Sequence, residues 1–293
     1  MRVGEAYGRG KFGLSFELFP PKTPAGEESL WTHLDELATF KPSFITCTYG
    51  AGGSTRDKTL QIVTEVRRRY GTPVASHLTC VGATVGQLRE YASEAAGRGI
   101  ENIVALRGDP PRGETSFQAV AGGLRYANEL VTLLRREFGQ FGIAVAGYPE
   151  MHHEADSPAA DLVNLKRKVD AGGDVVITQL FYNNADFFRF RDQCAAAGLA
   201  VPIVPGILPV TNFAQIQRIT SMCGARLPEA FVAALTACGD DEQRQFEIGV
   251  EFATAQVQEL LDANVPGVHF YVLNKSQATA AVLRAVRMAN TPS

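Results

Sequence analysis

The sequence predicts an α/β barrel, a (β/α)8 TIM barrel with extra helices between strands 7 and 8. Eight short apolar runs, rich in Val, Ile and Phe, alternate with amphipathic segments along the 293 residues. These runs are apolar almost throughout, as expected for parallel strands that helices cover on the outside. No linker-like or low-complexity stretch interrupts the alternation, so we expect residues 1–293 to form a single catalytic barrel domain.

Hydrophobic periodicity places the individual elements. Leu30, Leu34 and Leu37 form one apolar stripe of a helix that follows the first strand. Ser157 and Pro158 supply a cap and a first-turn proline for a later helix. The long connection before the last strand contains several helical stretches. The eight expected strands span residues 12–19, 44–49, 74–80, 102–107, 143–148, 175–181, 202–207 and 268–273.

An open, doubly wound sheet is the main alternative to a barrel. A dinucleotide-binding sheet of this kind has the pattern G-x-G-x-x-G directly after its first strand. Gly8, Gly10 and Gly13 have this spacing, but they precede the first expected strand. The barrel is therefore the favoured fold.

Composition excludes several classes of partner. The formal net charge is −3, from 28 basic and 31 acidic residues, which favours neither nucleic acid nor an anionic membrane. No apolar run approaches the roughly 20 residues of a membrane span, and the polar N-terminus lacks the apolar core of a secretory signal. The 5 cysteines are scattered and form no CxxC pair, which is typical of reduced thiols. We expect a cytoplasmic protein.

Polar residues recur at the ends of the expected strands. The carboxyl ends of barrel strands form the rim that carries the active site. Polar side chains repeated around this rim indicate an enzyme site rather than core packing. They are Glu17, Thr48, Tyr49, His77, Thr79, Arg107, Asp109, Tyr148 and Gln179, with Lys275 just after the last strand.

Glu17 is the strongest catalytic candidate. It lies between apolar residues in SFELFPPKT. Burial of a carboxyl beside apolar rings raises its pKa, which predicts a proton donor near neutral pH. The structural alternative is an ion pair of Glu17 with Arg107 or Lys275 across the barrel.

Two loops could contact a ligand. The glycine-rich segment 50–54 offers backbone N–H groups to a phosphate, although it could equally be a flexible turn. The segment LRGDPP places Asp109 where its carboxylate could accept hydrogen bonds from a heterocycle.

The segment YPEMHHEADS suggests a metal site but does not complete one. The candidate ligands are Glu150, His152, His153 and Glu154, which lie close together in the chain. No H-x-x-x-H spacing or distant ligand accompanies them, so we expect no metal. In the following helix Asp161, Asn164 and Lys168 share one face. This face suits a sugar–phosphate ligand, and a solvated helix face is the ordinary alternative.

Considered together, these segments resemble the methylenetetrahydrofolate reductase family in its short bacterial form. The similarity covers nearly the whole chain. The blocks that carry it are SFELFPPKT, TYGAGGSTRDKT, HLTC, NIVALRGDPP, YPEMHHEA, DLVNLKRKVDAGGDVVITQLF, VPGILPVTNF and HFYVLNK.

The resemblance implies a flavoenzyme that holds FAD non-covalently in a barrel. It implies reduction of 5,10-methylenetetrahydrofolate to 5-methyltetrahydrofolate with NADH or NADPH, in a ping-pong sequence. It also implies a homo-oligomer, either a dimer or a tetramer.

Residue roles follow from the same resemblance. Glu17 matches the general acid that protonates N10 of the folate, and Asp109 matches a catalytic residue that contacts the pterin near the flavin. Gln179, Gln215 and Lys275, with Asp109, match substrate contacts. The positions that match FAD contacts are Thr48, Tyr49, Ala51, His77, Arg107, Gly108, Asp109, Ala127, Tyr148, His152, Ala155, Asp161, Asn164, Arg167 and Lys168.

Two positions depart from the family pattern. Lys275 stands where the bacterial pattern has Arg, which keeps the charge but loses the bidentate fork. Ile219 stands where an aromatic residue usually stacks over the bound substrate or nicotinamide. The competing hypotheses are a proline dehydrogenase-like flavin barrel, a non-catalytic folate- or nucleotide-binding barrel, and a flavin-free aldolase-type barrel that uses Lys275.

Overall fold

The structure is a computed structural model that describes residues 1–8, 10–49, 55–110, 113 and 116–286. Its strands are β1 Gly13–Leu18, β2 Phe44–Cys47, β3 Val74–Thr79, β4 Asn102–Leu106, β5 Gly142–Gly147, β6 Val175–Thr178, β7 Ile203–Val204, β8 Gly206–Ile207 and β9 Gly267–Tyr271. Its helices are α1 Val3–Ala6, α2 Pro24–Ala38, α3 Arg56–Tyr70, α4 Val85–Gly97, α5 Ala127–Glu137, α6 Pro158–Asp170, α7 Asn184–Ala196, α8 Phe213–Cys223, α9 Glu229–Ala237, α10 Glu242–Asp262 and α11 Gln277–Ala285.

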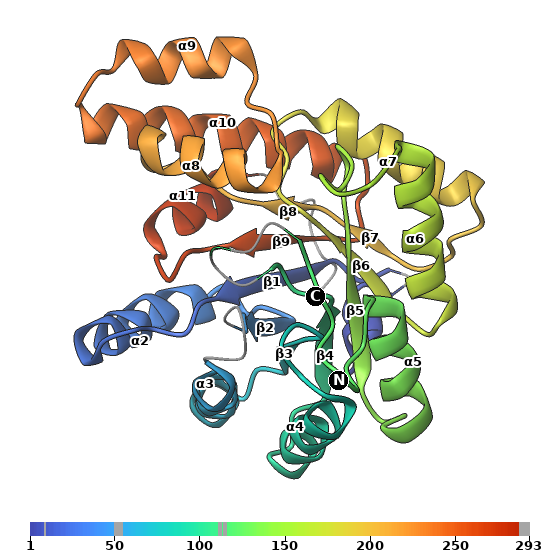
Figure 1. The fold of residues 1–293 in the computed structure, drawn as a ribbon. Helices are drawn as coiled ribbons and strands as arrows, with labels where there is room; N and C mark the ends of the chain where they lie inside the picture. Colours follow the sequence, from blue (N-terminus) through green and yellow to red (C-terminus); the bar gives the residue numbers. More distant parts are fainter. Residues whose placement is uncertain (9, 50–54, 111–112, 114–115, 287–293) are drawn as a thin grey trace.

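All strand pairs in the sheet are parallel, and the sheet closes on itself. The strand order is β7-β6-β5-β4-β3-β2-β1-β9-β8. Since β7 and β8 are consecutive in the chain, the two ends of this order meet. Helices surround the strands on the outside (Figure 1). The prediction of an α/β barrel is confirmed, and a strand overlaps each of the eight expected ranges, although β5 and β9 begin one residue earlier than expected.

The range 202–207 was expected to be one strand, but it forms two short strands on either side of Pro205. Ile203 and Val204 pair with β6, while Gly206 and Ile207 pair with β9. Proline has no N–H to donate to a ladder, which interrupts the strand at the point where it changes partner. The carbonyl of Pro205 still accepts a hydrogen bond from His269 N at 2.9 Å.

The seam of the barrel lies beside Pro205 and is closely packed. Gly206 N donates to Thr178 Oγ1 at 2.9 Å, and Tyr271 Oη donates to Thr178 O at 2.7 Å. A Cβ at Gly206 would overlap the Thr178 carbonyl and approach the Tyr271 ring. Glycine at this position therefore lets β6 and β9 approach the same short strand.

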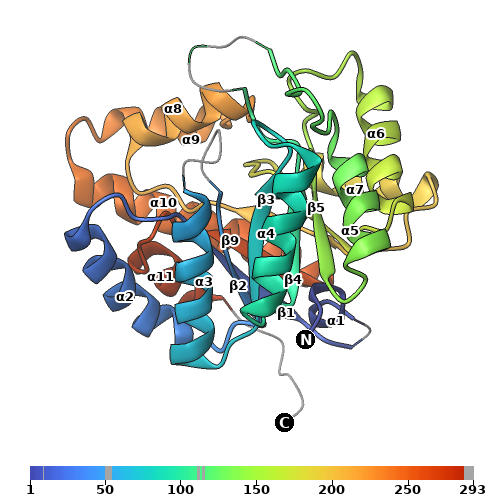
Figure 2. The same cartoon turned by 60° about the horizontal axis from the view of Figure 1, so that its bottom comes forward.

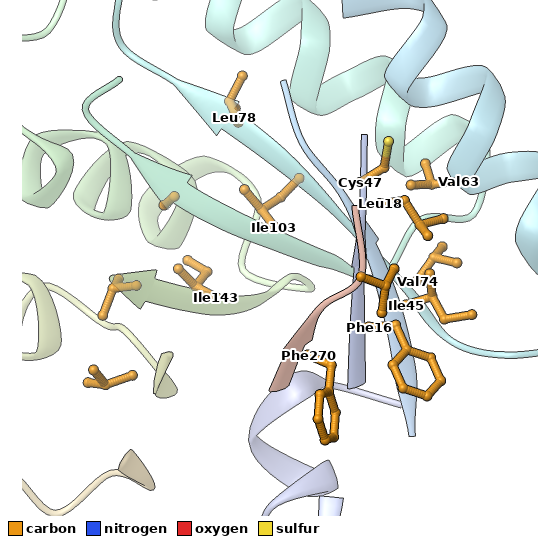
Figure 3. Close-up of a cluster of buried hydrophobic side chains, with 14 of the residues drawn as sticks. Phe16, Leu18, Ile45, Cys47, Val63, Val74, Leu78, Ile103, Ile143 and Phe270 are labelled. Carbon is orange, nitrogen blue, oxygen red and sulfur yellow. The ribbon is translucent and has the colours of Figure 1, made fainter. Parts of the chain in front are cut away.

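The main core lies between the strands and the surrounding helices. Alternate residues of the strands, such as Phe16, Ile45 and Phe270, point outward into this layer, where α3 adds Val63 (Figure 3). Period-2 alternation then turns Ser15, Glu17 and the other intervening residues toward the barrel axis. The outward face is apolar, whereas the inward face near the carboxyl ends is polar.

A short N-terminal helix, α1, closes the opposite end of the barrel (Figure 2). Its residues Val3 and Ala6, followed by Tyr7, pack with Phe44 and Ala75 in a second buried cluster on the barrel axis. The Asn102 side chain anchors this helix because its Oδ1 accepts from Val3 N at 2.7 Å. Sequence periodicity did not predict α1, since one helical turn is too short to show a period.

Gly249 provides a test of how α10 packs on the barrel. A Cβ at Gly249 would overlap the Val210 carbonyl oxygen, a backbone atom that cannot move independently. Gly249→Ala should therefore lower the free energy of unfolding by about 1–3 kcal/mol through overpacking. Urea titration followed by circular dichroism measures the change.

The matched control is Gly97→Ala, at the end of α4. A Cβ there meets no atom within 4 Å. This substitution should leave stability unchanged or raise it by up to about 1 kcal/mol, because alanine favours helix more than glycine. Equal effects of the two substitutions would contradict the packing we describe for α10.

Candidate active site

Glu17 lies at the carboxyl end of β1 and is buried, with 8% of its surface exposed. Its Oε2 lies 3.2 Å from His77 Nε2 on β3 and 3.5 Å from His269 Nε2 on β9. Both imidazoles are themselves buried. Residues from three strands that lie close together in the sheet order, β3, β1 and β9, thus meet on the inner face of the barrel below the rim.

These histidines change the expected charge of Glu17. Burial by itself raises the pKa of the carboxyl, but the interactions with His77 and His269 together outweigh it and lower the pKa to about 2. The expectation of a raised pKa is therefore wrong for this arrangement, because it considered burial without the two imidazoles. The alternative partners were also wrong: Arg107 pairs with Glu154, and Lys275 is exposed.

Two threonine hydroxyls beside Glu17 lack partners. Thr46 of β2 is the register partner of Glu17, and Thr79 lies two residues after His77, on the same face of β3. Within the described part of the chain, the buried Oγ1 atoms of both residues have no hydrogen-bond partner. Buried polar atoms are normally satisfied, so these hydroxyls indicate a surface that meets a ligand or water.

A cavity of about 990 Å³ opens next to the ends of β4 and β5. The N-terminus of α5, residues 116–119 and one face of α6 complete its walls. Nine residues that the resemblance assigned to FAD line it: Arg107, Ala127, Tyr148, His152, Ala155, Asp161, Asn164, Arg167 and Lys168. The helix face that carries Asp161, Asn164 and Lys168 therefore borders a cavity.

The start of α6 is fixed as its sequence predicts. Ser157 Oγ accepts a hydrogen bond from Ala160 N at 3.1 Å, which satisfies one of the free donors of the first turn. Asp161 then accepts a hydrogen bond from His152 N at 3.0 Å and ties the preceding loop to the helix. This arrangement holds His152 at the cavity wall.

The cavity wall carries positive charge that is partly paired. Arg107 makes a bidentate ion pair with Glu154, with Nη2 to Oε1 at 2.8 Å, and its guanidinium lies 5.0 Å above the centre of the Phe117 ring. Lys168 donates to Ala146 O and lies 5.7 Å from the centre of the Tyr148 ring. Burial lowers the pKa of Lys168 to about 8, although nearby Asp161 opposes this shift.

The other predicted site residues do not line this cavity. Thr48 and Tyr49 follow β2, Gly108 and Asp109 follow β4, and Gln179 follows β6, so all come from the carboxyl ends of strands. Gln215 lies in the first turn of α8, and Lys275 follows β9. Ala51 lies outside the described residues.

Gly108 has a conformation that requires glycine. Its φ is +88°, and a Cβ there would lie 2.6 Å from Val81 Cγ1. This close approach places the chain after β4 against the segment after β3 and leaves Asp109 exposed at the rim.

Several residues at the site had no clear signal in the sequence. His269 is one of them, since a histidine within an apolar strand usually serves packing. Phe117 and Arg125 line the cavity from segments without regular periodicity. Glu154 and Glu150 were considered as metal ligands, but they pair with Arg107 and Arg226.

The described residues offer neither a metal site nor a membrane-spanning helix. They contain no group of three or more His, Cys, Asp or Glu side chains arranged to hold a metal ion. In the same residues, no helix combines the length and the apolar character needed to cross a membrane.

Comparison with known proteins gives concordant matches. The family profile described as methylenetetrahydrofolate reductase matches residues 2–287. The 5,10-methylenetetrahydrofolate reductases of Pectobacterium carotovorum and Escherichia coli K12 are 43% and 42% identical, each over 94% of this chain and 90% of the relative. The methylenetetrahydrofolate reductase (NADH) 1 of Zea mays is 38% identical over 96% of this chain and 49% of its own length.

Among solved structures, similarity extends to more distant barrels. An uncharacterized protein from Clostridium thermocellum that binds two copies of 5-methyl-5,6,7,8-tetrahydrofolic acid superposes with a TM-score of 0.63 at 16% identity. The alignment covers 94% of each chain. At this identity the likeness supports the fold only.

The profile match spans nearly the whole chain, and the bacterial relatives share its length and more than two fifths of its residues. The chain therefore belongs to the methylenetetrahydrofolate reductase family and is an enzyme with that family's activity.

Proposed function

We propose that this reductase holds FAD non-covalently in the 990 Å³ cavity and reduces 5,10-methylenetetrahydrofolate to 5-methyltetrahydrofolate. The electron donor is NADH or NADPH, and both substrates use the flavin in turn in a ping-pong sequence. One observation carries this proposal. The nine residues that match FAD contacts of the family line one cavity at the rim of the barrel, and Glu17 lies below the same rim. Bound FAD supplies a two-electron carrier between the nicotinamide and the folate.

The chemistry of the cavity fits this cofactor. Arg167 and Lys168 supply positive charge for a diphosphate, and Asp161 and Asn164 supply acceptors and donors for sugar hydroxyls. Leu106 and Ala105 give an apolar section for a flat ring system. Next to it, the free hydroxyls of Thr46 and Thr79 face the barrel axis. Thr48, Tyr49, Ala51, His77, Gly108 and Asp109 would complete the FAD contacts from the rim.

Glu17 is the proposed proton donor to N10 of the folate. In the free site its pKa is about 2, so the carboxyl must regain a proton before each transfer. His77 Nε2 is the nearer imidazole nitrogen, at 3.2 Å, and can pass a proton to Oε2. Protonation of N10 breaks its bond to the methylene carbon, which becomes the hydride acceptor.

The remaining substrate contacts rest on the resemblance. Asp109 would act at the pterin, and its exposure at the rim leaves it accessible to a substrate. Gln179 and Gln215 would hydrogen bond to the folate. Lys275 would attract the glutamate carboxylates of the folate as a point charge, without the fork of an arginine.

The proposed setting is a cytoplasmic homo-oligomer without nucleic-acid or membrane partners. A net charge of −3 accords with this. One barrel domain would carry the whole reaction, with α8, α9 and α10 as the additional helices before β9.

Replacement of Glu17 tests the proton-donor role. Glu17→Gln should leave reduction of the flavin by the nicotinamide unchanged, because that step needs no proton at N10. Reoxidation of the flavin by methylenetetrahydrofolate should slow by about 100-fold or more. Anaerobic stopped-flow absorbance measures the two half-reactions separately.

The control is Glu90→Gln on the exposed face of α4, which should alter neither half-reaction. Equal loss of both half-reactions in Glu17→Gln would show that Glu17 serves the structure only. A purified protein that is colourless and does not bind FAD on titration would exclude the flavin mechanism altogether.

Lys168 gives a pH test of the cofactor site. Its free-state pKa of about 8 means that its positive charge is present below this value and is lost as pH rises through it. A bound diphosphate raises this pKa, so FAD binding should weaken progressively above about pH 8. Quenching of flavin fluorescence gives the Kd at each pH.

Lys168→Met should weaken FAD binding at neutral pH and remove this pH dependence. The control on the same helix is Lys166→Met, because Lys166 pairs with Asp170 at 2.8 Å and does not line the cavity. If the Lys168→Met protein kept the wild-type pH profile, Lys168 could not be the titrating group.

A further inference from the structure

A line of buried polar side chains runs from Glu17 toward the closed end of the barrel. His269 Nε2 faces the Glu17 carboxylate, and His269 Nδ1 lies 2.7 Å from Ser15 Oγ. Ser15 Oγ in turn lies 2.7 Å from Tyr7 Oη, just beyond α1. Tyr7, Ser15 and His269 are all buried.

The ring of Tyr7 occupies a slot that two glycines create. Gly13 of β1 and Gly267 of β9 are register partners, and a Cβ at either would overlap the Tyr7 ring. Phe44 contacts the ring edge-on at a centroid distance of 5.9 Å. The packing of the ring in this slot holds the hydroxyl of Tyr7 in one position, next to Ser15.

The donors and acceptors of Tyr7, Ser15 and His269 allow one favourable direction of hydrogen bonding. Within the described residues, Ser15 Oγ is the hydrogen-bond partner of the Tyr7 hydroxyl, whose burial prevents donation to bulk water. The phenol therefore donates to Ser15, and Ser15 donates its own proton to His269 Nδ1. His269 Nδ1 is then an acceptor, and the proton of the neutral imidazole resides on Nε2, facing Glu17. The reverse direction would leave the Tyr7 proton without an acceptor.

We propose that Tyr7 is a positioning residue that, through Ser15, locks His269 in the Nε2–H tautomer. In this tautomer His269 presents its Nε2 proton to the Glu17 carboxylate, 3.5 Å away, and cannot accept a proton from it. A protonated Glu17 then cannot lose its proton to His269, which leaves the substrate and His77, the proposed source of that proton, as the groups that can accept it. This inference rests on the proposed role of Glu17, but the tautomer itself is a property of the protein without substrate.

The other ionisable groups around Glu17 do not set this tautomer. His77 approaches the carboxylate from β3 and does not contact Ser15. Tyr271 on β9 is the register partner of Glu17, and burial raises the pKa of its phenol, so it remains neutral. Cys47 on β2 lies in the outward apolar core, and burial raises the pKa of its thiol as well. Phe44 stacks on the His269 ring without offering a hydrogen bond.

The test compares the tautomer of His269 with and without the Tyr7 hydroxyl, by two-dimensional 15N–1H NMR of the imidazole nitrogens. Because the Glu17 carboxylate also favours Nε2–H, the comparison is made in the Glu17→Gln protein, whose amide can either donate or accept. Tyr7→Phe keeps the ring in its slot and removes only the hydroxyl. We expect Nε2–H to predominate by about tenfold or more before this substitution and a mixture of tautomers after it.

Two further variants guard against a general structural effect. Tyr70→Phe removes a surface phenol that donates to Asp35 and should leave the His269 signals unchanged. Ser15→Ala removes the link between Tyr7 and His269 and should also produce a mixture of His269 tautomers. In the Ser15→Ala protein, the additional Tyr7→Phe substitution should not change that mixture. If Tyr7→Phe misfolds, Ser15→Ala alone still decides the outcome. Persistence of pure Nε2–H in both variants would overturn the proposal.

A kinetic readout separates this proposal from that for Glu17. With Glu17 intact, Tyr7→Phe should slow flavin reoxidation by methylenetetrahydrofolate about tenfold and leave reduction by the nicotinamide unchanged. The pH dependence of reoxidation should shift as well, because His269 can then share the Glu17 proton. Failure of the Glu17→Gln half-reaction test would refute the role of Glu17, whereas an unchanged tautomer would refute only the role of Tyr7.

Discussion

Closure of the sheet at Pro205 is the constraint on which the site depends. The short strands on either side of this proline pair with β6 and β9, which brings the first and last parts of the barrel into one ring. Thr178 and Tyr271 hydrogen bond across the same seam. Without this closure β9 would be an edge strand beside β1, and His269 would lie at an open edge of the sheet rather than on the axis of a ring.

Within that ring, the alternation of strands sorts residues by chemistry. Outward residues such as Phe16 and Phe270 build the apolar layer under the helices, while Glu17 and His269, one position away, turn inward. A buried carboxylate costs free energy unless it is paired, and the two imidazoles supply that pairing. The same contacts that make Glu17 tolerable in the interior also determine where its proton can go.

The cavity and the carboxylate play separate parts in the proposed reaction. The cavity draws its charge from α6 and the end of β4, which lie on one side of the barrel. Glu17 contacts His77 on β3 and His269 on β9. His269 is linked in turn through Ser15 to Tyr7 at the closed end of the barrel. A cofactor can therefore bind and exchange electrons on one set of residues while the proton is controlled by another.

The sequence alone determined the barrel, the approximate positions of its strands, the family and the α6 face that lines the cavity. These features are local, because they depend on periodicity, caps and contiguous motifs that lie within short stretches of the sequence. The tertiary structure decided the partners of Glu17, the interruption at Pro205 and the floor formed by α1. Each of these depends on residues far apart in the chain that meet only in the folded protein. Glu17 shows the difference, because burial predicted a raised pKa and the two histidines that β3 and β9 bring to it lower the pKa instead.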